Sequence, residues 1–247
     1  PFMFYFFQKK KFLVDSLENF IDIHNHILPG IDDGAKTVED SINLIKGFSD
    51  IGVKKFIATP HIMHNYYPNN PETINDSLLL LKNEVLKQNM KDISIRAAAE
   101  HMIDDNFESI LKNDAIMPLV DNYLLVEMSY LQASINFDEA ISETKKKGYF
   151  PILAHPERYL YLHNNYKKHK KYKKQGVLYQ LNLLSLSKYY GKEVQEMAFG
   201  LLEKDLIDFV GSDVHNIEQL NKLKEVEVTE KLMNILKPLL RMTYLSF

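Results

Sequence analysis

Short apolar runs rich in β-branched residues alternate with longer amphipathic stretches along most of the chain. Such runs are typical of buried strands, whereas apolar positions that recur every three or four residues are typical of helices. The sequence predicts seven strands, at residues 21–24, 55–59, 93–98, 123–127, 151–154, 178–181 and 208–210. It predicts helices between them, among others at residues 38–48, 71–88, 137–147 and 194–204.

Local signals mark where several helices begin and end. Thr37 followed by Asp40 predicts a capped start for the helix at 38–48, and Gly52, Gly148 and Gly176 each follow a helical pattern. Strands separated by helical crossovers are expected to run parallel. The pattern therefore predicts an α/β fold, a TIM-like barrel of seven strands, with an open doubly wound sheet as the alternative.

The chain has 247 residues, 45% of them hydrophobic, which suits one large domain. Because no linker or repeat interrupts it, we predict a single domain over residues 21–247, preceded by an N-terminal extension at residues 1–20. In this extension the apolar residues precede the lysines, which is the opposite of a secretory signal, and no run reaches the length of a membrane span. We expect a cytoplasmic protein without stable membrane insertion. The aromatic residues at 2–7 are expected to pack on the domain, with a membrane or partner contact as the alternative.

Composition narrows the chemistry that the chain can perform. It has no cysteine, which excludes disulfides, thiolate metal sites and cysteine nucleophiles. Its net charge of -3 gives no overall attraction for nucleic acid, so any phosphate would be bound in a local site. The basic run at residues 166–174 is interpreted as the solvated face of a helix, with docking of an acidic or phosphorylated peptide as the alternative; no nucleic acid is expected as a partner.

Histidines and carboxylates follow six of the seven predicted strands. In an extended chain His24 and His26 point the same way, so both imidazoles can reach one ion. The candidate ligands after strands are His24, His26, His61, Glu100, Glu127, His155, Asp213 and His215, and the loop after the first strand adds Asp33, or Asp32 in its place. Because the active sites of parallel barrels gather at the carboxyl ends of the strands, these residues are expected to converge.

Imidazole and carboxylate ligands without sulfur suit manganese, iron or zinc, and the share of acids favours a cluster of two to three divalent ions. Two ions that share a water molecule convert it to hydroxide near neutral pH and stabilise the oxygens of a phosphoryl transfer. The site therefore predicts hydrolysis by a metal-activated water, with no protein nucleophile.

The motifs, in their order, resemble those of bacterial protein-tyrosine phosphatases of the PHP family, a manganese-dependent type that regulates capsule and exopolysaccharide assembly. The similarity extends from about residue 21 to residue 216 and rests on the segments at 22–35, 59–61, 154–159 and 212–216. It implies a distorted (β/α)7 barrel and hydrolysis of phosphotyrosine. It also implies a phosphotyrosine protein as the partner, such as a bacterial tyrosine kinase.

The resemblance implies up to three metal positions. His24, His26, Glu100 and Asp213 would bind one ion; Glu100, Glu127 and His155 a second, with Glu100 bridging; and Asp33, His61 and His215 a third. Arg158 would face the substrate phosphate. Many relatives have a further arginine where this chain continues with residues 217–220, so the resemblance supplies no second phosphate-binding arginine.

Other interpretations of these residues are open at this point. Glu100 or Glu127 could be a structural acid paired with Arg158. We expect surface positions or ordinary hydrogen bonds for His64, His101, His163 and His169, and core or interface packing for residues 239–247. The alternative functions are a phosphatase of a small phosphomonoester such as histidinol phosphate, and a non-catalytic docking scaffold on the same barrel.

Overall fold

The computed structural model describes residues 10–247, and most of its strands form two parallel sheets. The smaller sheet has the order β2-β3-β5, formed by Ile21–Asp22, Lys55–Ala58 and Ser94–Ala97. The larger sheet has the order β10-β9-β8-β7-β6-β4. Its strands are β4 (His61–Ile62), β6 (Glu100–Met102), β7 (Tyr123–Glu127), β8 (Phe150–Ala154), β9 (Leu178–Asn182) and β10 (Phe209–Gly211). All strand pairs within these two sheets are parallel.

The two sheets are parts of one ring of strands. β3 continues into β4 and β5 into β6, each after a two-residue break, and Pro60 in the first break has no amide to donate. The first and last strands meet only near their carboxyl ends, where the Asp213 amide donates to the His24 carbonyl at 2.7 Å and the His26 amide to the Val214 carbonyl at 3.0 Å. The predicted α/β barrel-like fold is confirmed, but no continuous ladder closes the barrel, because β2 is too short to pair along its length with β10.

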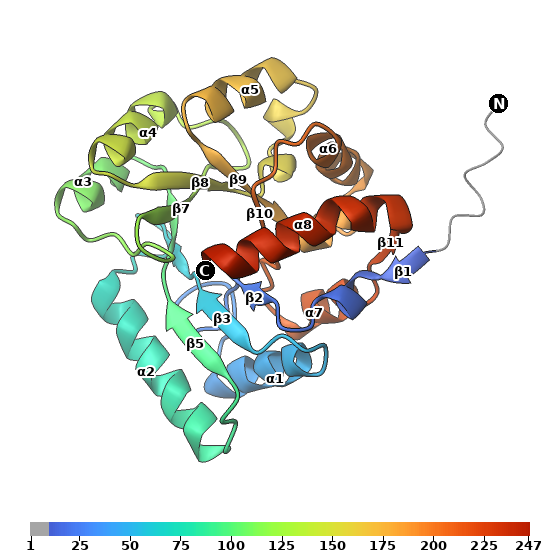
Figure 1. Cartoon of the computed structure of the whole chain (residues 1–247). Coiled ribbons are helices and arrows are strands. Elements are labelled where there is room, and N and C mark those ends of the chain that lie inside the picture. The colour runs from blue at the N-terminus through green and yellow to red at the C-terminus, as the bar shows by residue number, and fades with distance from the viewer. Residues whose placement is uncertain (1–9) are drawn as a thin grey trace.

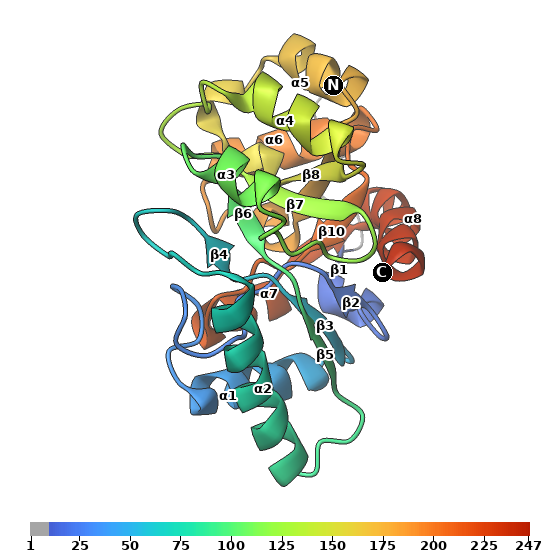
Figure 2. The same cartoon turned by 90° about the vertical axis from the view of Figure 1, so that its left-hand side faces the viewer.

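The main helices surround this ring (Figure 1). They are α1 (Val38–Ser49), α2 (Pro71–Lys87), α3 (Phe107–Lys112), α4 (Phe137–Lys146), α5 (Tyr166–Lys174), α6 (Lys192–Glu203) and α7 (Ile217–Lys224). Figure 2 shows α1 and α2 on one side of the sheets, at the bottom of the view, and α4, α5 and α6 on the other side, at the top. The predicted capping box is confirmed by reciprocal bonds between Thr37 and Asp40, and Gly52, Gly148 and Gly176 all have positive φ at helix ends.

α8 (Glu230–Ser246) lies across the ring of strands (Figure 1). It buries Met233, Leu236 and Leu240, and the Thr243 hydroxyl accepts from the Val210 amide of β10 at 3.1 Å. The ring of Phe247 contacts the rings of Tyr123 and Phe209 edge-on. The tail at 239–247 thus packs against the core.

The basic run forms α5, whose buried side chains are His169 and Tyr172. Lys171 pairs with Asp138 at 2.5 Å and Lys173 pairs with Asp208, and the remaining lysines of the helix are exposed or half-buried. This arrangement agrees with the interpretation of the run as the outer face of a helix.

Part of the predicted N-terminal extension packs on the domain. β1 (Lys10–Phe12) pairs with β11 (Glu227–Thr229), and Leu13 and Leu17 are buried in the main apolar core. The aromatic residues at 2–7 lie outside the described residues. No helix within residues 10–247 is both long enough and apolar enough to cross a membrane.

Candidate metal centre

The nine predicted ligands meet at the carboxyl ends of the strands, from the ends of β2, β7, β8 and β10 and from β4 and β6. Two of them have unusual backbones. His155 has φ 35 and ψ 56, and Asp213 has φ 52. These positive φ values belong to the left-handed region, which residues other than glycine seldom adopt. Such conformations are common at functional sites, where the surrounding structure holds them.

Four buried side chains form the first donor group. The Nε2 atom of His24 lies 3.2 Å from both Glu100 Oε2 and Asp213 Oδ1. The Nε2 atom of His26 lies 3.6 Å and 3.4 Å from the same two oxygens. Two imidazoles and two carboxylates therefore point at one position, and these are the four residues that the resemblance implies for one ion.

The second donor group is built around Glu100 and Glu127. His61 Nδ1 lies 3.2 Å from Glu100 Oε2 and 2.9 Å from Glu127 Oε1. His155 Nε2 lies 3.0 Å from the other oxygen of Glu100, Oε1. Glu100 thus spans the first two groups, as expected for a bridging carboxylate, but the structure adds His61 to a group for which the sequence predicted His155.

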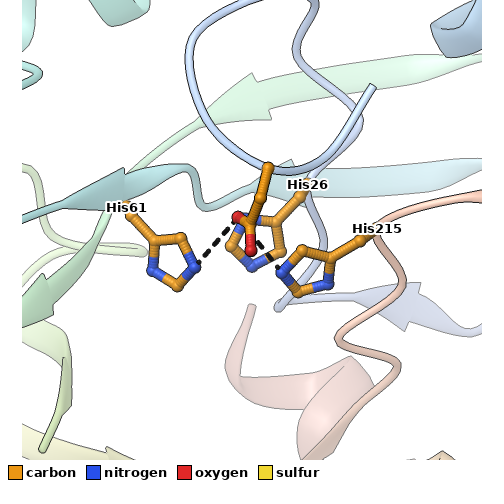
Figure 3. Close-up of side chains that lie close together, drawn as sticks. His26, His61 and His215 are labelled. Carbon is orange, nitrogen blue, oxygen red and sulfur yellow. Dashed lines mark ion pairs between the residues drawn. The ribbon is translucent and has the colours of Figure 1, made fainter. Parts of the chain in front are cut away.

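The third group contains Asp33, His61 and His215 with His26 beside them (Figure 3). Asp33 Oδ1 lies 3.4 Å from His61 Nε2 and 3.6 Å from His215 Nε2, while the rings of His26 and His215 stack with centroids 3.8 Å apart. Both nitrogens of His61 therefore face carboxylates. A neutral imidazole has one nitrogen free to bind a metal, so His61 can complete only one of the two groups at a time.

The donors fit divalent metal ions by their burial as well as by their chemistry. Among residues 10–247, the buried atoms without a hydrogen-bond partner include His24 Nε2, His26 Nε2, His61 Nδ1, Glu100 Oε2 and Glu127 Oε1. Burying such atoms unpaired is costly, and all five face the donor groups. Nitrogen and oxygen donors without sulfur suit manganese, iron or zinc.

Neighbouring side chains fix the orientation of the two histidines after β2. His24 Nδ1 donates to Gln180 Oε1 at 2.7 Å, and His26 Nδ1 donates to Asp32 Oδ2 at 2.7 Å. Each bond uses Nδ1 and leaves Nε2 turned toward the donor group, as is usual for metal-binding histidines. Asp32 therefore positions His26, and Asp33 faces the site. The sequence pattern did not reveal Gln180; its only signal is a polar residue between two apolar ones in a buried strand.

Burial and neighbouring charges shift the pKa values of the histidines in the site. Burial opposes protonation of His24, but Glu100 and Asp213 outweigh it and raise the pKa of His24 to about 9. Burial likewise opposes protonation of His26, and Asp32 raises its pKa to about 10. Burial, with a contribution from His26, lowers the pKa of His215 to about 4. A metal ion must therefore displace protons from His24 and His26 but not from His215.

Arg158 follows His155 in a short 3-10 helix, Pro156–Arg158, and reaches the edge of the site. Its Nη1 donates to Asp213 Oδ2 at 2.6 Å, and its guanidinium lies between the rings of Tyr130 and Tyr190, 4.6 Å and 4.1 Å from their centroids. The alternative pairing with Glu100 or Glu127 is wrong, because the acidic partner is Asp213, whose second oxygen faces the first donor group.

The site opens into a cleft of about 850 Å³. His61, Glu127, His155, Asp213 and His215 line its floor together with Arg158, and Tyr67 and Tyr130 line its walls. The ring of Tyr67 stacks on that of His61 with centroids 5.5 Å apart. A partly apolar cleft lined by a cationic group and by members of a donor cluster can accept an aromatic phosphoester.

The remaining histidines lie outside the donor groups. His64 is exposed, and His163 Nε2 donates to the Glu157 carbonyl at 2.7 Å. The surface alternative is wrong for His101 and His169, which are both buried. Both form ordinary hydrogen bonds, His101 with the Leu125 carbonyl at 3.0 Å and His169 with the Leu162 carbonyl at 3.2 Å.

A parallel, barrel-like α/β fold with imidazole and carboxylate donors gathered at its strand ends defines a class of metal-binding barrel proteins. Residues 20–232 match the profile of the CpsB/CapC family of capsular polysaccharide synthesis. The chain belongs to this family, which agrees with the resemblance predicted from its motifs.

Relatives in three bacteria support this assignment. The chain is 31% identical over 202 residues to the tyrosine-protein phosphatase YwqE of Bacillus subtilis (strain 168), covering 81% of this chain and 79% of the relative. It is 31% identical over 200 residues to the putative tyrosine-protein phosphatase CapC of Staphylococcus aureus, covering 80% and 77%. It is 30% identical over 204 residues to the tyrosine-protein phosphatase CpsB of Streptococcus pneumoniae, covering 80% and 84%.

The fold has a close counterpart among solved structures. Crystal structures of YwqE from Bacillus subtilis and CpsB from Streptococcus pneumoniae, described as unique metal-dependent tyrosine phosphatases, match this chain with a TM-score of 0.77. The match has 29% sequence identity and covers 88% of this chain and 86% of the other.

Proposed function

We propose that this chain is a metal-dependent protein-tyrosine phosphatase of capsule or exopolysaccharide synthesis. The observation that carries the proposal is the set of three donor groups, linked in pairs by His26, His61 and Glu100. Members of all three groups line one cleft. The family and the activity of its relatives agree with it. The partner would be a phosphotyrosine protein, such as a bacterial tyrosine kinase, and the protein would act in the cytoplasm.

The nine side chains would hold two to three divalent ions, with manganese as the first candidate and iron or zinc as alternatives. Bound ions of this kind supply a hydroxide at neutral pH and neutralise charge on the phosphoryl oxygens. Glu100 would tie the ions together, because its two oxygens already face His24 and His155.

The chain itself would bind and orient the phosphate. Arg158 offers a planar cation whose direction is fixed by Asp213 and by the two tyrosine rings, so it can contact a phosphoryl oxygen without losing much side-chain freedom. Tyr67 and Tyr130 would flank the phosphate-bearing ring and exclude water from it.

Three substrates test the proposal. We expect the metal-loaded protein to hydrolyse a phosphotyrosine peptide with a higher kcat/KM than a phosphoserine peptide or histidinol phosphate. A preference for histidinol phosphate would instead support a phosphatase of small phosphomonoesters. Absence of turnover on all three would leave the docking scaffold as the better account and would overturn the proposal.

A further inference from the structure

The most exposed large apolar side chains in the described part of the chain gather at the cleft. Ile135 is 99% exposed, Leu131 90% and Tyr66 77%, and all three line the cleft that contains the donor groups. The next most exposed, Leu86 at 72%, lies on α2 away from the cleft. Exposed apolar residues are common singly, but their concentration at the mouth of one cleft marks a binding surface.

These side chains stand next to residues that touch the candidate site. Tyr67 stacks on His61, and the neighbouring residue is Tyr66. The Tyr130 hydroxyl lies 3.3 Å from His155 Nε2, and the neighbouring residue is Leu131. Because consecutive Cα atoms are about 3.8 Å apart, both exposed side chains begin within one residue of the site.

The loop that carries Leu131 and Ile135, residues 129–136, is anchored at both ends. The Tyr161 hydroxyl donates to the Ser129 carbonyl at 2.8 Å. The Ser134 hydroxyl donates to the Ile103 carbonyl at 2.7 Å, and Phe137 directly after the loop is 3% exposed. Leu131 and Ile135 are therefore held outward by a fixed loop, which lowers the entropy that a ligand must overcome on binding them.

We infer that Leu131 and Ile135, with Tyr66 on the opposite loop, bind apolar or aromatic residues that flank the phosphotyrosine of a protein substrate. The inference rests on the proposed function, and it names the substrate class more closely: a peptide segment whose neighbours to the phosphotyrosine are apolar. The phosphoryl group occupies the floor and the neighbouring side chains cover the exposed residues at the mouth. A small phosphomonoester fills only the floor and leaves the mouth uncovered.

The test compares Leu131→Ser, Ile135→Ser and the double variant with the wild-type protein, all loaded with manganese. The substrates are para-nitrophenyl phosphate, a phosphotyrosine peptide with leucine and tyrosine neighbours, and the same peptide with serine and glycine neighbours. Leu86→Ser is the matched control, because it removes another largely exposed leucine, 72% exposed, outside the cleft.

Each single substitution should raise KM for the apolar-flanked peptide about threefold to tenfold, and the double variant should raise it about tenfold to hundredfold, with little change in kcat. Hydrolysis of para-nitrophenyl phosphate and of the serine-flanked peptide should stay within about twofold of wild type, as should every rate of the control.

The inference is overturned if the double variant has the wild-type KM for the apolar-flanked peptide. It is also overturned if the kcat/KM of the double variant falls equally for all three substrates. If the wild-type protein hydrolyses the apolar-flanked and the serine-flanked peptides with the same kcat/KM, the inference fails but the proposed phosphatase activity stands. A wild-type protein inactive on both peptides overturns the proposed function itself.

Discussion

Arg158 is the side chain whose role depends most on its neighbours. It is 18% exposed, donates to Asp213 and is enclosed by two tyrosine rings. The contact with Asp213 links the proposed phosphate-binding cation to a candidate metal ligand. A change at Arg158 can therefore act on the substrate or on the metal, and the two effects can be separated by experiment.

Arg158→Lys should keep the positive charge beside Asp213 but lose the planar fork. The metal content should stay at the wild-type level, whereas kcat/KM should fall about tenfold to hundredfold for a phosphotyrosine peptide and for a simple aryl phosphate. Metal analysis and steady-state kinetics on the same preparation check both. If the variant loses metal, Arg158 is instead a positioning residue for Asp213.

The clustering of the candidate ligands could be predicted from the sequence because most of them lie at or just after the end of a predicted strand, and parallel strands bring their carboxyl ends together. His24 and His26 even follow from two-residue alternation alone. The partition of the ligands could not be predicted, since it depends on side-chain rotation: His61 turns Nδ1 toward Glu127 and Nε2 toward Asp33. Gln180 and the tyrosines around Arg158 were missed for a similar reason, because their role is set by contacts far apart in the sequence.

Among the elements, β10 supports the site most directly. Its last residue, Gly211, packs against His24 and Gln180: an added Cβ would lie 2.8 Å from the Cβ of His24 and 3.0 Å from Nε2 of Gln180. The same two residues share the hydrogen bond that orients His24. The glycine thus permits the close approach of β10 to β2 and β9.

Gly211→Ala should push His24 away from Gln180. We expect the substitution to lower the free energy of unfolding by about 1 to 3 kcal/mol and to weaken metal binding about tenfold or more. Gly148→Ala is the control, because its φ of 89 imposes backbone strain while nothing lies within 4 Å of the added Cβ. The control should lose stability and keep its metal affinity; equal losses of metal affinity in both variants would contradict the role of Gly211. Chemical denaturation and metal titration measure the two quantities.

The sequence predicted the elements better than their connections. The strand at 123–127 coincides with β7, and the others differ from prediction by a few residues at their ends. The continuation of β3 into β4 beyond Pro60 was not predicted. Strand β6 was not predicted either, because Glu100, His101 and Met102 lack the apolar run of a buried strand. Their strand conformation comes from pairing with β4 and β7.

At the scale of the whole molecule, metal binding is coupled to pH and to stability. In the metal-free protein the carboxylates raise the pKa of His24 to about 9 and that of His26 to about 10. A raised pKa stabilises the folded state below the ordinary histidine value of about 6.5, and this contribution is lost as the pH rises through about 9 to 10. Metal ions bind the deprotonated ligands, so their affinity rises over the same range.

The difference in Tm between metal-loaded and chelator-treated protein should therefore widen from about pH 6.5 to about pH 9. Because the metal displaces one proton from His24 and one from His26, the gap should grow by about 5 to 11 °C per pH unit. Thermal unfolding at a series of pH values measures it. A gap that does not widen with rising pH would show that metal binding displaces no protons from these histidines.

We propose that the clustered side chains hold the metal ions on which phosphotyrosine hydrolysis depends. The most direct measurement follows hydrolysis of a phosphotyrosine peptide while chelator-treated protein is reloaded with manganese, with bound metal counted in each sample. Activity should be absent without metal and should rise with bound manganese to a plateau at two or three ions per chain. His26→Ala should lower both bound metal and activity, whereas His64→Ala, an exposed histidine outside the donor groups, should change neither. Full hydrolysis of the peptide by protein shown to contain no metal would contradict the account.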